Sequence, residues 1–413
     1  MIAFFAALLG LWLIASPATF GYTQHILAWS DWISGALLLF LGLFLRTRTI
    51  ATWSYALIGL WLGFAPLAFW APNVAAYLNE TTAGVLAIAL FLSLPAWPRQ
   101  LPDTGPSIPP GWSYNPSSWP QRLPIAFLAF LGWMFSRYMA AYQLGYIHTM
   151  SDPFFPDGTL HVITSDVSKA FPIPDAGLGA LAYSLEMLST FKGGDRRWRT
   201  MPWMVLVFGL LAIPLSLTSV ILILLQPLIV GAWCTWCLLT AFCMLILMAL
   251  SLDEVIATLQ YLRYSKEKPL LPLLFQGGLC PSAKADTRTP SLDAPLHTLL
   301  KASAWGLTFP WTLLAAALLS ACLMFIPNHF ALRNLIQDLD HAIGALLIVT
   351  SMVSFSEIAR PLRWLNLPLA AAIALTALLT TSGPSFWAEF LLCLAIALLS
   401  IPRGEICEKT TWK

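Results

Sequence analysis

Long apolar runs separated by polar connections dominate this sequence, and they constrain the fold more than any other feature. Twelve runs are predicted, at approximately 2–15, 31–45, 52–70, 80–95, 123–145, 175–191, 203–225, 229–250, 305–326, 340–356, 364–380 and 386–401. A helix that crosses a bilayer needs about 20 residues, so the shorter runs must extend into their flanks. The pattern predicts an all-α, polytopic integral membrane protein with about 12 transmembrane helices.

The composition agrees with a membrane location. Of the 413 residues, 58% are hydrophobic and 10% are charged, whereas a soluble chain carries about a quarter charged residues. We find no basic patch interleaved with aromatic residues, so nucleic acid is not an expected partner. The first 15 residues lack the positive n-region of a signal peptide and are interpreted as the first membrane helix.

The positive residues alternate along the connections between runs. The even-numbered connections and the C-terminal tail hold most of them, namely Arg46, Arg48, Arg99, Arg122, Lys192, Arg196, Arg197, Arg199, Arg263, Lys266, Lys268, Lys284, Arg288, Lys301, Arg360, Arg363, Arg403, Lys409 and Lys413. The odd-numbered connections hold only Lys169 and Arg333. By the positive-inside rule, both termini are expected to be cytoplasmic.

Two polar stretches, at 95–124 and 264–295, divide the chain into three blocks of four helices. We predict an N-terminal membrane block at 1–98, a central four-helix bundle at 120–262, a cytoplasmic linker at 263–300 and a C-terminal membrane block at 301–402. Short connections within the outer blocks suggest that they pack against the central block. The alternative is that they bind a partner membrane protein.

The two outer blocks share a pattern in which an acidic residue precedes a glycine by one helical turn. It occurs at Asp31 and Gly35, at Glu80 and Gly84, and at Asp340 and Gly344. With Ser16-Pro17 before the first unit, the pattern resembles the SPW-repeat membrane family, although Ala18 stands where that signature has tryptophan. We interpret the acid as a helix N-terminal group that binds free N–H groups, and the glycine as a site of close helix approach. The alternative is a proton or ion pathway.

A Cys-x-x-Cys pair, Cys234 and Cys237, opens the eighth run. The two residues lie about one helical turn apart, so both sulfurs can share a face and form a disulfide. Thiol–disulfide exchange needs this proximity, because the second thiol resolves the mixed disulfide. The predicted topology places the pair at the extracytoplasmic end, where disulfides persist. The alternatives are two packed thiols or an inert structural bridge. Cysteine and histidine are not clustered as metal ligands would be, so no metal is expected.

Three motifs in the central block carry a second resemblance. They are Val162-Ile163-Thr164-Ser165 followed by Phe171 and Pro172, Asp175-x-x-x-Gly179-x-x-x-Tyr183, and Cys234-x-x-Cys237-x-x-Thr240. In this order they resemble the vitamin K epoxide reductase family, a four-helix bundle that couples quinone reduction to disulfide formation.

The resemblance implies the roles of individual residues. Cys237 would face the quinone and Cys234 would be its exchange partner, so these two are the predicted catalytic residues. Asp175 stands where the family commonly has an asparagine near a quinone oxygen. Asp175, Thr240 and Tyr183 are the predicted cofactor-binding residues.

The same resemblance implies the surroundings of the site. The expected electron acceptor is ubiquinone or menaquinone, and the expected partners are the lipid bilayer and a thioredoxin-like extracytoplasmic protein. The expected location is a bacterial inner (plasma) membrane.

The outer loop, 151–159, departs from the family because it contains no cysteine. Ser151 and Thr159 stand where a second, shuttle pair would lie. Either a partner attacks Cys234 directly, or the protein no longer oxidises thiols. The alternative function is a non-catalytic membrane scaffold, or a binding or transport protein, built on a degenerate reductase domain.

Some charges fall inside apolar runs, where an unpaired charge is expensive. We predict an ion pair between Arg137 and Glu186 inside the bundle, with a proton path as the alternative. Glu357 is predicted to pair with Arg360 or Arg363.

Overall fold

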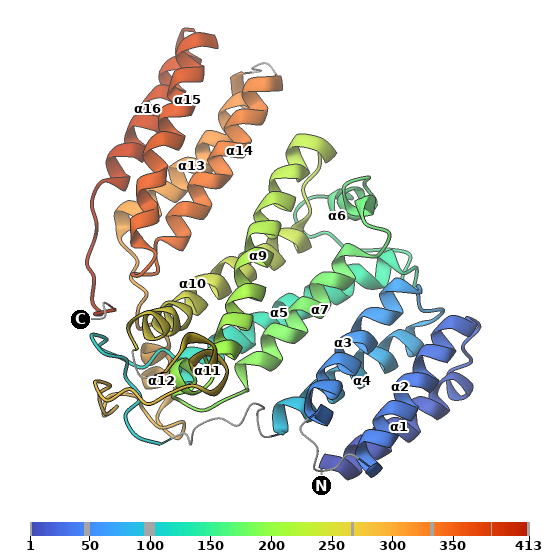
Figure 1. Ribbon diagram of the computed structural model, residues 1–413. Coiled ribbons are helices and arrows are strands. Elements are labelled where there is room, and N and C mark those ends of the chain that lie inside the picture. Colours follow the sequence, from blue (N-terminus) through green and yellow to red (C-terminus); the bar gives the residue numbers. More distant parts are fainter. Residues whose placement is uncertain are drawn as a thin grey trace.

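The computed structural model describes residues 2–44, 50–94, 104–265, 268–330, 334–380 and 382–410 (Figure 1). Within these ranges the chain forms helices and isolated β-bridges but no strand. Six charged residues used for the topology prediction, Arg46, Arg48, Arg99, Lys266, Arg333 and Lys413, lie outside the described residues. The all-α fold class is confirmed.

Each of the twelve predicted apolar runs overlaps one long helix, although the ends differ. The helices are α1 (Ile2–Thr19), α2 (His25–Phe44), α3 (Ile50–Ala68), α4 (Val74–Ser93), α5 (Trp119–Gln143), α7 (Asp175–Thr190), α9 (Pro202–Leu225), α10 (Thr235–Tyr264), α13 (Trp311–Phe330), α14 (Asn334–Val353), α15 (Asn366–Thr380) and α16 (Pro384–Ser400). Among the described residues, seven helices are long and apolar enough to cross a membrane. The number of twelve spans stays a prediction.

Glycines let the helices of the N-terminal block approach each other closely. A Cβ atom on Gly35 of α2 would lie 2.7 Å from the carbonyl oxygen of Gly10 on α1. A Cβ atom on Gly84 of α4 would lie 2.7 Å from the carbonyl oxygen of Gly59 on α3. Only glycine permits this distance between helix backbones, so the interpretation of these glycines as sites of close approach is confirmed.

The interpretation of the repeated acids as helix N-terminal groups was wrong. Asp31 lies in the interior of α2, Glu80 in the interior of α4 and Asp340 in the interior of α14. The three helices begin six residues before these acids, at His25, Val74 and Asn334. The acids are therefore too far from the free N–H groups to bind them, and all three are fully buried.

The central block packs α5, α7, α9 and α10 around one apolar core. Tyr183, Phe208, Met244 and Leu247 are buried in it. The block is fixed to its N-terminal neighbour by Lys192, which follows α7. Its ammonium group donates to the carbonyl oxygens of Leu92 (2.6 Å) and Leu94 (2.7 Å) at the end of α4, where a helix has no N–H partners of its own.

The described parts of the polar stretches predicted as linkers lie in a layer at one end of the central bundle. The layer includes the short helices α8 (Arg197–Thr200), α11 (Leu270–Gln276) and α12 (Leu296–Ser303). Figure 1 shows this layer and the C-terminus at the end opposite to α6 (Gly158–Ile163). An ion pair joins the second polar stretch to the C-terminal segment in this layer, since the Arg288 guanidinium lies 2.6 Å from the carboxylate of Glu408.

Glu357 also belongs to this layer, and its predicted pairing with Arg360 or Arg363 was wrong. Its carboxylate accepts hydrogen bonds from the backbone N–H groups of Cys407 (2.9 Å) and Glu408 (2.8 Å). A carboxylate in a buried position needs donors of some kind, and the returning C-terminal segment supplies them.

Candidate redox site

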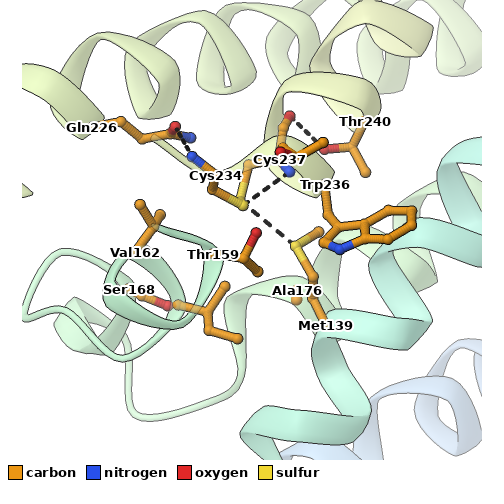
Figure 2. The surroundings of a disulfide bond; sticks show 12 residues. Met139, Thr159, Val162, Ser168, Ala176, Gln226, Cys234, Trp236, Cys237 and Thr240 are labelled. Atoms are coloured by element: carbon orange, nitrogen blue, oxygen red, sulfur yellow. Dashed lines mark hydrogen bonds between the residues drawn. A yellow bond between two sulfur atoms is a disulfide. The ribbon is translucent and has the colours of Figure 1, made fainter. Parts of the chain in front are cut away.

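The Cys234–Cys237 pair is bonded as a disulfide at the start of α10 (Figure 2). Cys234 is the N-cap residue, and its sulfur accepts the N–H of Cys237 at 3.0 Å. The N–H of Cys234 in turn donates to the side-chain oxygen of the buried Gln226, at 3.0 Å. The helix begins later than the apolar run predicted, because the residues before Cys234 form a separate turn, η2 (Gln226–Val230). The motif thus lies where a helix presents free N–H donors.

The two sulfurs differ in their exposure. Cys234 is fully buried, whereas Cys237 is half-buried. The Cys237 sulfur lies 3.6 Å from the Met139 sulfur, and both residues belong to an apolar cluster with Ile163 and Trp236. This cluster joins α5, α6 and α10. An incoming molecule can therefore reach Cys237 more directly than Cys234.

A single carboxylate, Asp152, fastens the outer loop over the pair. It accepts hydrogen bonds from the hydroxyl groups of Thr159 and Thr235, and from the backbone N–H groups of Phe154 (3.1 Å) and Phe155 (2.9 Å). Burial raises the pKa of Asp152, but the hydrogen bonds outweigh burial and hold the pKa well below its usual range. We call this group of bonds the Asp152 clasp.

Of the two positions where shuttle cysteines would lie, Thr159 belongs to the clasp and Ser151 does not. Thr159 is fully buried and lies beside the disulfide in Figure 2. Ser151 is exposed, and its carbonyl oxygen accepts the indole N–H of Trp236 at 2.8 Å. The loop is thus held by hydrogen bonds at both positions. Asp152 was not among the predicted site residues. The signal that could have identified it is an aspartate before proline, since such an aspartate commonly accepts hydrogen bonds from nearby backbone N–H groups.

Gly158 permits the close contact between the loop and the motif. A Cβ atom at this position would lie 2.1 Å from the carbonyl oxygen of Trp233 and 2.9 Å from the side chain of Phe155. No side chain fits in that space, so the residue must be glycine for the loop to sit against the residue before Cys234.

The structure brings two of the three predicted cofactor-binding residues together. The hydroxyl of Tyr183 donates to the carbonyl oxygen of Thr240 at 2.7 Å, and the Thr240 hydroxyl donates to the carbonyl oxygen of Cys237 at 2.8 Å. Both hydroxyl groups therefore hold the first turn of α10 in place. Their contact with a quinone stays a prediction.

Asp175 lies in a polar cluster of its own at the start of α7. One of its oxygens accepts from the side-chain amide of Gln143 (2.5 Å), the hydroxyl of Ser168 (2.9 Å) and the N–H of Ala176 (2.7 Å). Ala176 packs in the same apolar cluster as Cys237. The Asp175 carboxylate is thus adjacent to the apolar cluster of Cys237, and it already accepts hydrogen bonds from donors of the protein.

The C-terminal block also reaches the motif. The ring of His341 on α14 lies 6.4 Å from the ring of Trp233, which precedes Cys234. His341 is buried, and its Nδ1 is 2.7 Å from the carbonyl oxygen of Gln337. No sequence signal marks this contact, because the two residues are distant in the chain.

The predicted ion pair between Arg137 and Glu186 does not form. The Arg137 guanidinium lies over the rings of Trp133 (4.9 Å) and Tyr77 (5.1 Å), where the aromatic faces attract it. Both carboxylate oxygens of Glu186 are buried without a hydrogen-bond partner. A small hollow beside Arg137 is lined by Tyr77, Trp133 and Ser184, between α4, α5 and α7.

The described part of the chain has no group of three or more His, Cys, Asp or Glu side chains that could hold a metal ion. The disulfide itself indicates sulfur chemistry at this site. A cysteine pair at this spacing can be oxidised to a disulfide and reduced again by thiol–disulfide exchange.

Comparison with known families agrees with this geometry. Residues 123–252 match the model of the Vitamin K epoxide reductase family, and residues 1–93 match the model of the SPW repeat domain. No curated protein and no solved structure matches the chain. The central block is thus a membrane domain of a thiol–disulfide oxidoreductase family. That family is the vitamin K epoxide reductase family, and the N-terminal block is an SPW repeat domain. The likeness of the C-terminal block to SPW repeats stays a prediction.

Proposed function

We propose that the central domain transfers two electrons between the Cys234–Cys237 pair and a quinone in the membrane. The observation that carries the proposal is the position of the disulfide. It lies at the start of α10 in a family domain, with Cys234 covered and Cys237 half-buried in an apolar cluster. The proposed location is a bacterial inner membrane with both termini cytoplasmic and the disulfide at the extracytoplasmic face.

The electrons and protons of the reaction balance between the cysteine pair and the quinone, with no further reactant. The two thiols lose two electrons and two protons as the S–S bond forms, and the quinone becomes a hydroquinone. In the reduced protein, the N–H of Cys237 stabilises negative charge on the Cys234 sulfur, as helix N-termini do for thiolates. Met139 and Trp236 supply apolar surface next to Cys237 and exclude water.

The polar groups next to this surface are the proposed quinone contacts. The Gln143 amide and the Ser168 hydroxyl, now bound to Asp175, are donors that a quinone oxygen could take over. Tyr183 holds the carbonyl oxygen of Thr240 and so fixes the turn on which Cys237 is carried. The quinone, when bound, supplies a two-electron acceptor.

A protein partner that attacks Cys234 must first displace the Asp152 clasp. Because Cys234 is fully buried under the outer loop, a thioredoxin-like partner can attack it only when the loop opens. A small thiol has the alternative of the half-buried Cys237. The proposed partner class is therefore an extracytoplasmic dithiol that displaces the loop.

The test uses the full-length protein in lipid nanodiscs. The reduced protein is incubated with or without a soluble ubiquinone or menaquinone analogue, and the alkylation of each cysteine is measured by mass spectrometry. Protection of Cys234 and Cys237 only when quinone is present supports the proposal. The variant Cys237→Ala should lose this protection, and Cys243→Ala, a buried cysteine of α10 outside the pair, should keep it.

One observation favours a second candidate, a non-catalytic membrane scaffold. The outer loop lacks cysteines and is fastened over Cys234 by hydrogen bonds, so no built-in relay reaches the pair. On this hypothesis the disulfide is structural. A pair that stays oxidised under mild reductant, or stays reduced when quinone is added, would support the scaffold and overturn the oxidoreductase.

A further inference from the structure

Both outer blocks repeat one arrangement of acidic residues that the redox chemistry does not use. In each block an aspartate is followed 49 residues later by a glutamate, as Asp31 and Glu80 in the first and Asp340 and Glu389 in the second. Each acid is followed four residues later by a small residue, which is Gly35, Gly84, Gly344 or Cys393. The fourth acid, Glu389, escaped sequence analysis because cysteine stands in place of glycine.

All four carboxyl groups are fully buried in the helix interior. Each has an exposed fraction of 0%. Glu80, Asp340 and Glu389 have no hydrogen-bond partner on either oxygen. Asp31 has one donor, the hydroxyl of Tyr22 at 3.0 Å, and its other oxygen is unpartnered. In the part of the chain that the structure describes, neither pair has a lysine or arginine as counter-ion.

The two acids of each block lie close enough to repel each other when charged. The charge of Asp31 acts on Glu80, and the charge of Glu389 acts on Asp340. The two acids of each pair come from different helices, since α2 carries Asp31 and α4 carries Glu80, while α14 carries Asp340 and α16 carries Glu389.

The groups that face the pairs are neutral or weakly acidic. Tyr22 and Tyr146 interact electrostatically with acids of the N-terminal pair, and Cys393 interacts with those of the C-terminal pair. Asn79 donates to the hydroxyl oxygen of Tyr22 at 3.3 Å, and the half-buried Tyr22 lies in the turn between α1 and α2. None of these groups balances a negative charge.

An ionised carboxylate without a partner is too costly to persist in such a place. Moving one ion from water to a dry protein interior costs several kcal/mol even after the protein relaxes. Two like charges close together cost more, because they also repel each other. Carboxyl groups in close pairs solve this by holding a proton, as paired acids do in other proteins.

We propose that each outer block is a proton-binding unit, in which the buried pair Asp31–Glu80 or Asp340–Glu389 holds a proton inside the membrane. A metal cation is a poorer fit, because the oxygen-binding cations take six or more oxygen ligands and each pair supplies four carboxylate oxygens. In the N-terminal block, the hydroxyl of Tyr22 links Asp31 to the turn at the protein surface and so gives the proton a route to water.

The experiment is infrared spectroscopy of the full-length protein in lipid nanodiscs at neutral pH. Protonated carboxyl groups have a C=O stretching band separate from that of carboxylates, and the band shifts in heavy water. We expect Glu80→Gln and Glu389→Gln each to remove part of this band, and the double variant to remove the sum. Both substitutions are isosteric and uncharged, so the protein is expected to fold.

The matched control is Asp293→Asn, which changes an exposed acid in the polar layer and should leave the band unchanged. A second measurement uses Asp31→Asn and Asp340→Asn, which substitute the other acid of each pair. The proposal is overturned when all four variants have the band of the parent protein. It is also overturned when the band appears only after sodium is replaced by choline, since the ligand would then be the cation.

Discussion

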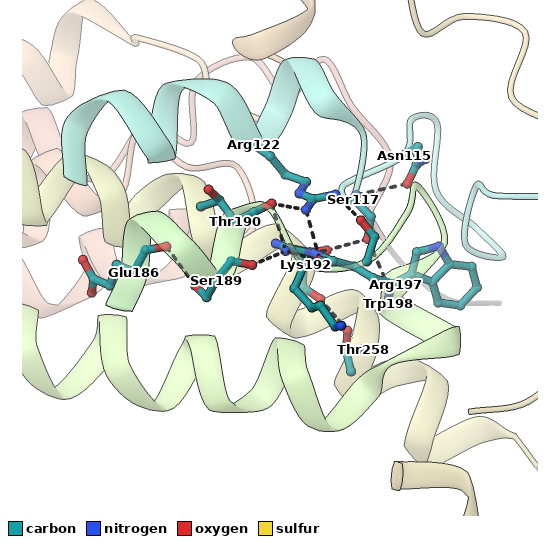
Figure 3. Close-up of polar contacts among 12 residues, drawn as sticks. Asn115, Ser117, Arg122, Glu186, Ser189, Thr190, Lys192, Arg197, Trp198 and Thr258 are labelled. Atoms are coloured by element: carbon teal, nitrogen blue, oxygen red, sulfur yellow. Dashed lines mark hydrogen bonds and ion pairs between the residues drawn. The ribbon is translucent and has the colours of Figure 1, made fainter. Parts of the chain in front are cut away.

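The two ends of the central bundle bury polar groups in opposite ways. At the end away from the cysteines, the side chains of Arg197 and Glu254 are 1% and 3% exposed and lie 2.5 Å apart. Ser117 donates a further hydrogen bond to Glu254, and the Arg197 guanidinium also donates to the carbonyl oxygens of Ser189 and Lys192 (Figure 3). This end cannot rearrange without leaving a charge buried and unpaired.

At the cysteine end, a single partly solvated carboxylate holds the structure in place. Asp152 holds the outer loop to Thr235 through hydrogen bonds alone, and water can replace those bonds when the loop moves. The bundle is thus fixed by a buried ion pair at the polar layer, and by hydrogen bonds that water can replace at the cysteine end. The predictions below test this difference between the two ends.

The largest expected effect is at the fixed end. Arg197→Met leaves Glu254 charged and buried, so the free energy of unfolding should fall by about 3–5 kcal/mol. Thermal unfolding in detergent measures the loss. The control is Arg288→Met, whose pair with Glu408 is 42% exposed on the arginine side and should cost about 0–1 kcal/mol. Equal effects of the two variants would remove the distinction between a fixed end and an ordinary surface.

A smaller effect is expected where the loop meets the motif. Gly158→Ala places a methyl group 2.1 Å from the Trp233 carbonyl oxygen, so the loop must shift, at a cost of roughly 1–3 kcal/mol. The same measurement of thermal unfolding applies, together with alkylation of Cys234 after reduction, which should become faster. Gly179→Ala is the control, because its methyl group would meet only the Ser136 side chain, at 3.3 Å or beyond. An unchanged alkylation rate for Gly158→Ala would show that the loop does not cover Cys234.

The Asp152 clasp itself should contribute less. Asp152→Ala removes a charged acceptor, and we expect a loss of roughly 1–2 kcal/mol, at the low end for charged hydrogen bonds because water reaches the carboxylate. In the Cys237→Ala background, the alkylation rate of Cys234 should rise about tenfold, the factor that corresponds to 1.4 kcal/mol. Asp166→Ala, an exposed acid beyond α6, is the control. Equal rates in both variants would mean that Asp152 does not hold the loop.

The sequence predicted the fold class well, because hydrophobic runs and lipid leave few choices for the backbone. It also located Cys234 and Cys237, whose spacing alone permits a disulfide. Helix starts were less predictable. Asp31 seemed to begin a helix because its charge bounds the apolar run, but α2 begins six residues earlier, at His25.

Contacts between distant segments could not be predicted from the sequence. The Asp152 clasp joins a loop to a helix start far along the chain, and His341 meets Trp233 from another block. The Arg137–Glu186 pair was expected because both charges fall in apolar runs. The position of a residue in an apolar run indicates its depth in the membrane, but not the direction in which its side chain points. Arg137 lies instead over aromatic rings.

The smallest expected effect is the pH dependence of the clasp. The pKa of Asp152 in the folded protein lies below its ordinary value, because the hydrogen bonds favour the carboxylate. The unfolded chain therefore takes up a proton first as the pH falls, and the clasp's contribution to stability is complete above the ordinary pKa and declines below it. The difference in Tm between the parent protein and Asp152→Asn should be constant from neutral pH down to about pH 5, and should shrink below about pH 4. A difference that vanishes already near neutral pH would assign the loop's attachment to a group other than Asp152, and the cysteine end would then open under conditions in which the Arg197–Glu254 end stays closed.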